Sequence, residues 1–164
     1  MLILGVDPGA KGGLAIVGFS GSVPYIAAKT IMPMRHKVIS GKKRGKIDLE
    51  EAARWIDSHA SKIKFCIFED VGAMPRQGVT SMFSFGQNTG QVEGIIAANF
   101  IPIHYVKPRK WKKWLHLSDN KDASLDLARQ TFGKEHFPLK KHDGVAEAAL
   151  MTLWAKDQLR GVAA

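Results

Sequence analysis

Four acidic residues are distinctive because they lie in apolar segments: Asp7, Glu69, Asp143 and Glu147. The first two each end an apolar run, at residues 2–6 and 65–68, and the last two open an alanine-rich segment. Carboxylates that converge in a basic protein are the oxygen ligands that Mg²⁺ requires. A pair of such ions roughly 3.5–4 Å apart stabilises the attacking and leaving oxygens of a phosphodiester. The set therefore predicts metal-dependent phosphodiester hydrolysis, with all four acids as catalytic metal ligands.

Spacing decides which neighbouring acids can share a site. Side chains alternate along a strand, so Glu69 and Asp70 point to opposite faces and only one of them can join the set. Asp143 and Glu147 are four residues apart in an expected helix, which places them on one face, one turn apart. Two like charges at that spacing repel unless a cation lies between them. Asp7 by itself has a second interpretation, as a turn residue whose carboxylate accepts from the glycine-rich turn at 8–13.

The elements that would position these acids form an alternating pattern. Apolar runs bounded by glycine predict an antiparallel meander of strands at 2–7, 13–19 and 23–29, and further strands at 65–70 and 101–106. Helical spacing predicts helices at 48–60, 81–98, 119–132 and 144–159. The second of these helices is apolar on more than one face, so we expect it to be central or to pack against a second subunit. The sequence thus predicts a layered α/β fold, in one domain spanning 1–164.

Residues 34–46 interrupt this pattern with lysine, arginine and glycine and no apolar period. We expect a mobile loop here, either an arm that binds a phosphate backbone or a solvated loop. A second basic segment, 107–114, interleaves five cations with Trp111 and Trp114. Those cations suit phosphate contacts, whereas the tryptophans are expected to enter the core. His142 is either a catalytic helper or a helix-entry residue.

Composition limits the possible partners. The chain has 164 residues, a net charge of +9 and an isoelectric point near 9.8, which favour a polyanionic partner such as nucleic acid. No apolar stretch is long enough to span a bilayer, and no signal peptide is evident, so we expect no membrane association. The one cysteine, Cys66, lies in an apolar run and fits a reducing cytoplasm.

Four stretches of the sequence resemble the RuvC-type Holliday junction resolvases of the ribonuclease H-like superfamily. They are GVDPG at 5–9, FEDV at 68–71 with the loop up to SMFSFG at 81–86, VKP at 106–108 with Lys121 before Ser124, and HDGVAEA at 142–148. The second and fourth are most similar to the branch often found in phage genomes. Many members space the last two acids three residues apart, whereas Asp143 and Glu147 are four apart. The position three before Glu147 is Gly144.

This resemblance implies a fold, an activity and a set of partners. It implies a five-stranded mixed sheet, its first three strands antiparallel, flanked by helices. It implies a cytoplasmic homodimer, of bacterial or phage origin, that cuts opposed strands of a four-way DNA junction with two Mg²⁺ ions per site, for which Mn²⁺ substitutes. The four acids would hold the metal ions, and the loop at 73–79 would enter the junction centre. The cations expected to contact DNA are Lys11, Arg76, Lys107, Arg109, Lys110 and Lys121.

Three other interpretations compete with a junction resolvase. A ribonuclease H-like nuclease with broader action on forks and flaps would share the same acids. A non-catalytic junction-binding module would need only the charge. An actin- or hexokinase-like ATPase also opens with a strand and an Asp-x-Gly turn. That class clamps a nucleotide between two such domains, and 164 residues are too few for both, so we expect no nucleotide cofactor.

Overall fold

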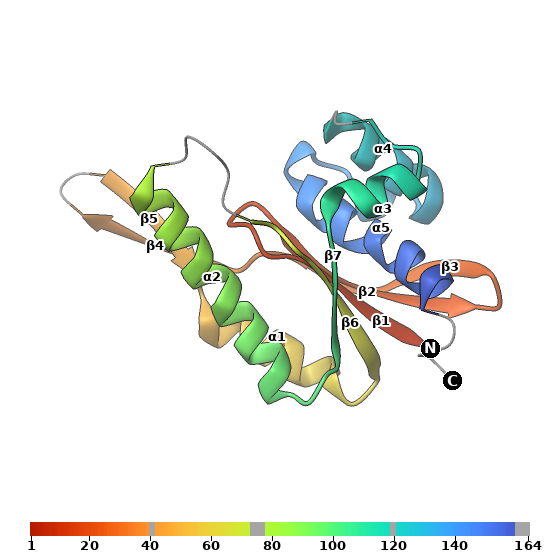
Figure 1. Ribbon diagram of the computed structural model, residues 1–164, viewed down its shortest axis with the longest axis horizontal. Helices are drawn as coiled ribbons and strands as arrows, with labels where there is room; N and C mark the ends of the chain where they lie inside the picture. The colour runs from red at the N-terminus through yellow and green to blue at the C-terminus, as the bar shows by residue number, and fades with distance from the viewer. Residues whose placement is uncertain (40–41, 73–77, 119–120, 160–164) are drawn as a thin grey trace.

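A five-stranded mixed sheet forms the centre of the protein (Figure 1). The computed structural model describes residues 1–39, 42–72, 78–118 and 121–159. The strand order is β3-β2-β1-β6-β7, antiparallel between β1, β2 and β3 and parallel between β1, β6 and β7. The bounds are β1 Leu2–Asp7, β2 Gly13–Ser20, β3 Val23–Ile31, β6 Ile63–Glu69 and β7 Ile103–Val106. The predicted five-stranded sheet with an antiparallel first half is confirmed.

Helices cover both faces of this sheet. Figure 1 shows that helices pack on each side of it. The first face carries α1 (Leu49–Ala60) and α2 (Val79–Ala98), and the second carries α3 (Pro108–Trp114), α4 (Lys121–Phe132) and α5 (Asp143–Gln158). Each layer has its own core, because alternate residues of β1 point to opposite sides: Leu4 packs into the α1–α2 core and Ile3 into the α3–α5 core. Because both faces of the central strands are buried, their sequences are continuous apolar runs.

Residues 34–39 and 42–46 form strands, so the prediction of a mobile loop in this part of the chain was wrong. They form most of an antiparallel hairpin of β4 (Met34–Ile39) and β5 (Lys42–Ile47), a separate two-stranded sheet that extends beyond the main one in Figure 1. The hairpin is anchored at its base, where Met34 pairs with Ile47 and the Asp48 N–H donates to the Pro33 carbonyl at 2.9 Å. Backbone pairing between the two strands does not depend on an apolar pattern, and the sequence of these strands shows no apolar alternation.

α2 is the longest helix and leaves most of its surface uncovered. Only Asn88, Val92 and Ile96 are buried, whereas Val79 and Phe83 are 84% and 71% exposed. Within the described part of the chain no helix is both long enough and apolar enough to cross a membrane. The predicted apolar character on more than one face is confirmed, and here the second face is open to solvent.

α5 lies unusually close to the sheet because two glycines allow it. A Cβ on Gly5 would collide with the carbonyl oxygen of Ala148, and a Cβ on Gly144 would lie 2.5 Å from the Cα of Gly12. Gly12 and Gly144 also form an isolated bridge between the β1–β2 turn and the start of α5. This contact brings the first turns of α5 to the ends of the central strands.

Candidate active site

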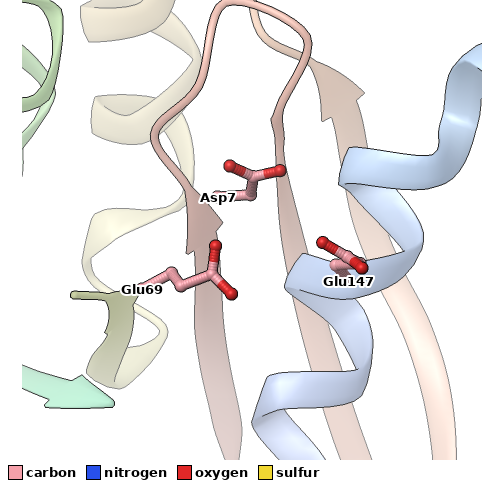
Figure 2. A group of neighbouring side chains, drawn as sticks. All are labelled: Asp7, Glu69 and Glu147. Atoms are coloured by element: carbon pink, nitrogen blue, oxygen red, sulfur yellow. The ribbon is translucent and has the colours of Figure 1, made fainter. Parts of the chain in front are cut away.

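Three of the four predicted acids come together at one edge of the sheet (Figure 2). One carboxylate oxygen from each of Asp7, Glu69 and Glu147 lies within 4.8 Å of the others. The acidic cluster, as we call these three residues, draws on β1, β6 and α5, elements that are far apart in the sequence.

Strand geometry places the first two acids. β1 and β6 are parallel neighbours with Gly5 opposite Ile67, so their carboxyl ends meet at the same edge. Glu69 shares the face of Phe65 and Ile67, which belong to the α5 core. Asp70 follows on the opposite face, as the alternation predicts, and its carboxylate pairs with Lys107 at 3.0 Å.

Burial and mutual repulsion raise the pKa values of the cluster. Desolvation raises the pKa of Asp7 to about 6, with Glu147 and Asp143 adding to the rise and the Gly9 N–H opposing it. Desolvation likewise raises the pKa of Glu69 to about 7, and the charge of Asp7 adds to it. Both groups are destabilised as anions in the metal-free protein. A bound cation would remove that penalty.

Three side chains that sequence reasoning missed hold the acidic cluster in place. Trp111 Nε1 donates to Glu69 Oε1 at 2.9 Å, and Ser124 Oγ donates to Glu147 Oε1 at 3.0 Å. Lys112 Nζ pairs with the same Glu147 oxygen at 2.7 Å, and both of these side chains are largely buried. A buried indole N–H needs a hydrogen-bond acceptor. The expectation that Trp111 enters the core therefore implied a buried acceptor nearby, which the structure identifies as Glu69. No pattern in the sequence separates Lys112 from its basic neighbours.

Asp143 lies at the margin of the acidic cluster. It is not one of the three acids whose oxygens converge, but its charge contributes to the raised pKa of Asp7. Its Oδ1 accepts from the N–H of Gly144 at 3.0 Å. An acid at position 144 could not replace it, because any Cβ there would meet Gly12. The four-residue spacing is thus tied to the contact between α5 and the β1–β2 turn.

The donor set of the site fits a hard divalent cation. The candidate ligand atoms are all carboxylate oxygens, and Lys112 is a largely buried cation that pairs with one of the three converging acids. Mg²⁺ and Mn²⁺ both favour such oxygen sites. A partly buried group of acids with raised pKa values is also typical of a reaction centre.

Four of the six cations predicted to bind DNA have described side chains. Lys11 is exposed on the β1–β2 turn, and Lys107 is 69% exposed beside Asp70. Arg109 and Lys110 are exposed on α3, where Lys110 Nζ lies 5.3 Å from the centre of the Trp154 ring. Arg76 and the side chain of Lys121 lie outside the described residues, although the backbone of Lys121 opens α4.

The fold is shared with solved Holliday junction resolvases. RuvC from Thermus thermophilus in complex with a Holliday junction substrate has a TM-score of 0.68 and 18% identity, covering 96% of each chain. Another Thermus thermophilus RuvC structure has a TM-score of 0.63 and 16% identity over the same shares. The fowlpox virus Holliday junction resolvase has a TM-score of 0.52 and 15% identity, covering 97% of this chain and 99% of that one. Protein-family models and curated sequences give no match. These similarities confirm the predicted RuvC-like fold.

Proposed function

We propose that the protein is a metal-dependent endonuclease that resolves four-way DNA junctions by paired nicks. The observation that carries this proposal is the convergence of Asp7, Glu69 and Glu147 within 4.8 Å on a RuvC-like fold. The net charge of +9 supports a nucleic-acid substrate, because acids are gathered at the site while cations predominate in the chain.

The acidic cluster, with Asp143 at its margin, would hold two Mg²⁺ ions. Bound there, the ions supply Lewis acidity and a nucleophilic hydroxide at neutral pH. Asp7 ends β1, the central strand of the sheet, and would hold metal together with Glu69 and Glu147. Trp111 orients the Glu69 carboxylate by its hydrogen bond, and Ser124 does the same for Glu147. Attack on phosphorus breaks the bond to the 3′ oxygen and leaves 5′-phosphate and 3′-hydroxyl ends.

Lys112 is a better candidate for a lysine at the reacting phosphate than Lys107. Lys112 Nζ lies against the acidic cluster, whereas Lys107 is bound to Asp70 on the other face of the strand. If Glu147 serves as a metal ligand, the Lys112 ammonium beside it would be placed to bind a phosphate oxygen and to offset charge that develops there. Lys107 and Lys121 remain proposed contacts to the DNA backbone.

We infer that two copies pair through the open face of α2. Val79 and Phe83 are exposed there, and Gly86, Gly90 and Gly94 form a row one turn apart with open space above each. A row of glycines lets a second helix approach closely, and exposed large apolar residues mark an interface. A dimer would carry two acidic clusters, one for each of two opposed strands.

A cleavage panel tests the proposed function. Wild-type protein with Mg²⁺ should nick a synthetic four-way junction in opposed strands, and Asp7→Asn should bind the junction without cutting it. Asp57→Asn, an exposed acid on α1, is the matched control and should cut normally. Equal rates on linear duplex would overturn the junction selectivity, and faster cutting of forks or flaps would favour a broader branched-DNA nuclease. Unchanged cleavage by Asp7→Asn would overturn the assigned site.

A further inference from the structure

A groove of about 620 Å³ opens beside the acidic cluster. Its walls are the β1–β2 turn, the segment from the end of β3 to the start of β4, and the 3₁₀ turn η2 (Lys140–His142). Residues that are far apart in the sequence, such as Lys11, His36 and Lys141, thus line the same groove. Of its lining residues, only Asp143 takes part in the chemistry proposed at the acidic cluster.

The groove is continuous with the reaction centre. Asp143 lines it, and so does Gly12, which lies so close to Asp7 that an added Cβ would be 2.1 Å from the Asp7 carbonyl oxygen. Gly12, also in the wall, bridges to Gly144 at the start of α5. A polynucleotide strand with one phosphate at the acidic cluster could therefore continue directly into this groove.

The lining has the chemistry of a site for a nucleic-acid strand. Three exposed lysines form its rim: Lys11, Lys140, which is 88% exposed, and Lys141. The acids among its lining residues are Asp143 and Glu51. Its remaining surface includes apolar side chains from residues 31–34, of which Met32 is buried and Ile31 is exposed. Cations at the rim suit phosphates, and an apolar floor suits sugars and bases.

The β4–β5 hairpin extends the same surface outward. His36 on β4 lines the groove, so the hairpin begins at its edge. Residues 34–47 contain six lysines and arginines and no acid. Backbone pairing and the closure between Pro33 and Asp48 hold the strands. Arg35 also pairs with Asp48 and Glu50 at the hairpin base, so the surplus of positive charge lies with the other five cations. A projecting arm of one charge sign is suited to a polyanion.

We propose that this groove and the β4–β5 hairpin bind the phosphodiester backbone of the DNA arm that flanks the cut. The inference rests on the proposed function and adds the path of the substrate to it. The protein would hold the scissile phosphate at the acidic cluster, the next nucleotides of the strand in the groove, and the more distant backbone of that arm along the hairpin.

Binding measurements on the full chain test the groove. In an Asp7→Asn background, Lys140→Gln with Lys141→Gln should weaken binding to a fluorescent four-way junction. The plot of log affinity against log salt should become shallower by about 1.8, or about 0.9 for each lost phosphate contact. The matched control is Lys62→Gln with Lys64→Gln, two exposed lysines at the other end of β6, which should leave the slope unchanged. Equal slopes in the two double variants would overturn the inference.

A second variant tests the hairpin by arm length. Residues 35–46 can be replaced by Asn-Gly, because Met34 and Ile47 are already paired at the hairpin base. Wild-type affinity should rise as the junction arms are lengthened, and the shortened variant should lose that gain while it still cuts short-armed junctions. The same dependence on arm length in both proteins would overturn the role of the hairpin. Cutting of short-armed junctions also reports that the shortened variant is folded.

The two proposals fail in different ways. If the wild-type protein neither binds nor nicks junctions, the proposed function fails and the groove assignment with it. If the wild type nicks junctions while the Lys140/Lys141 variant behaves like its control, only the groove assignment fails.

Discussion

Helices α5 and α2 are both apolar around their circumference, yet the fold treats them in opposite ways. Ten of the sixteen residues of α5 are buried, against three of the twenty residues of α2. α5 is covered by the sheet and by α4, whereas one face of α2 has no cover in the described chain. The difference separates two roles that composition alone does not distinguish. One helix holds a charge inside the molecule, and the other exposes apolar side chains such as Val79 and Phe83 to solvent.

Burial explains why the acid on α5 has chemical consequences. Glu147 stands among buried alanines and reaches Lys112 and Ser124, so its charge acts over short distances in a site with little water. α2 carries one acid, Glu93, whose carboxylate accepts from the hydroxyl of exposed Tyr105. That acid takes part in no cluster with other acids among the described residues.

The largest expected effect is on the α5 side of the comparison. Glu147→Gln keeps the size of the side chain but removes a charge from the acidic cluster, and junction nicking should fall by more than about 100-fold. The basis is that loss of a residue that only supports a metal ligand typically costs about 10–100-fold. Nicking rates at saturating Mg²⁺ measure it, with Glu93→Gln on α2 as the matched control. Equal rates for the two variants would remove the contrast between the helices.

The second prediction concerns pH and metal. The pKa of Asp7 is about 6 in the folded protein against an ordinary 3.8, so the unfolded chain releases its proton first as the pH rises. Its contribution to stability is therefore greatest at low pH, and about 3 kcal/mol is lost between about pH 4 and 7 in metal-free protein. Glu69, with a pKa of about 7, changes stability in the same direction over a range that ends slightly higher.

Urea unfolding at pH 4.5 and 7.5 in EDTA measures this loss. Asp7→Asn removes one of the two titrating groups and should reduce the pH dependence, leaving the part that comes from Glu69. Mg²⁺ should stabilise the wild type more at pH 7.5 than at pH 4.5. The same pH dependence in wild type and Asp7→Asn would contradict the burial of this carboxylate as the cause.

The third prediction tests the support of the acidic cluster. Trp111→Phe keeps a large ring in the α5 core but removes the donor to Glu69, and we expect a 10–100-fold loss of nicking at limiting Mg²⁺. Part of that loss should be recovered at high Mg²⁺, because a positioning role weakens metal binding. Trp114→Phe in the same helix is the control, since its ring is partly exposed. A loss that high Mg²⁺ leaves unchanged would assign Trp111 to packing alone.

The smallest expected effect is on α2. Phe83→Glu places a charge on the open face and should weaken self-association about 30-fold, the size expected for an interface residue worth about 2 kcal/mol. Sedimentation velocity at a series of concentrations measures it, with Val23→Glu on exposed β3 as the control. Paired nicks should become single nicks while chemistry at each site persists. A wild-type protein that is monomeric at all concentrations would overturn the role assigned to α2.

Sequence reasoning located the strands and the acids because both depend on local pattern. β1 and β6 are continuous apolar runs, and Asp7 and Glu69 are the acids at which those two runs end. Alternation along β6 correctly separated Glu69 from Asp70. The hairpin was missed because its ladder needs no apolar face and therefore leaves no period to detect. The DNA-contacting roles of Lys107, Arg109 and Lys110 stay predictions.

The sequence by itself determined that carboxylates would end buried strands and begin a buried helix, because runs of apolar residues predict burial from local sequence alone. Only the tertiary structure decided which side chains surround them. Lys112, Trp111 and Ser124 reach the acidic cluster because α3 and α4 pack against α5, and the tight contact between Gly12 and Gly144 sets how α5 approaches the sheet. Such contacts depend on how whole helices pack against one another, and the spacing of residues within one segment does not predict that packing.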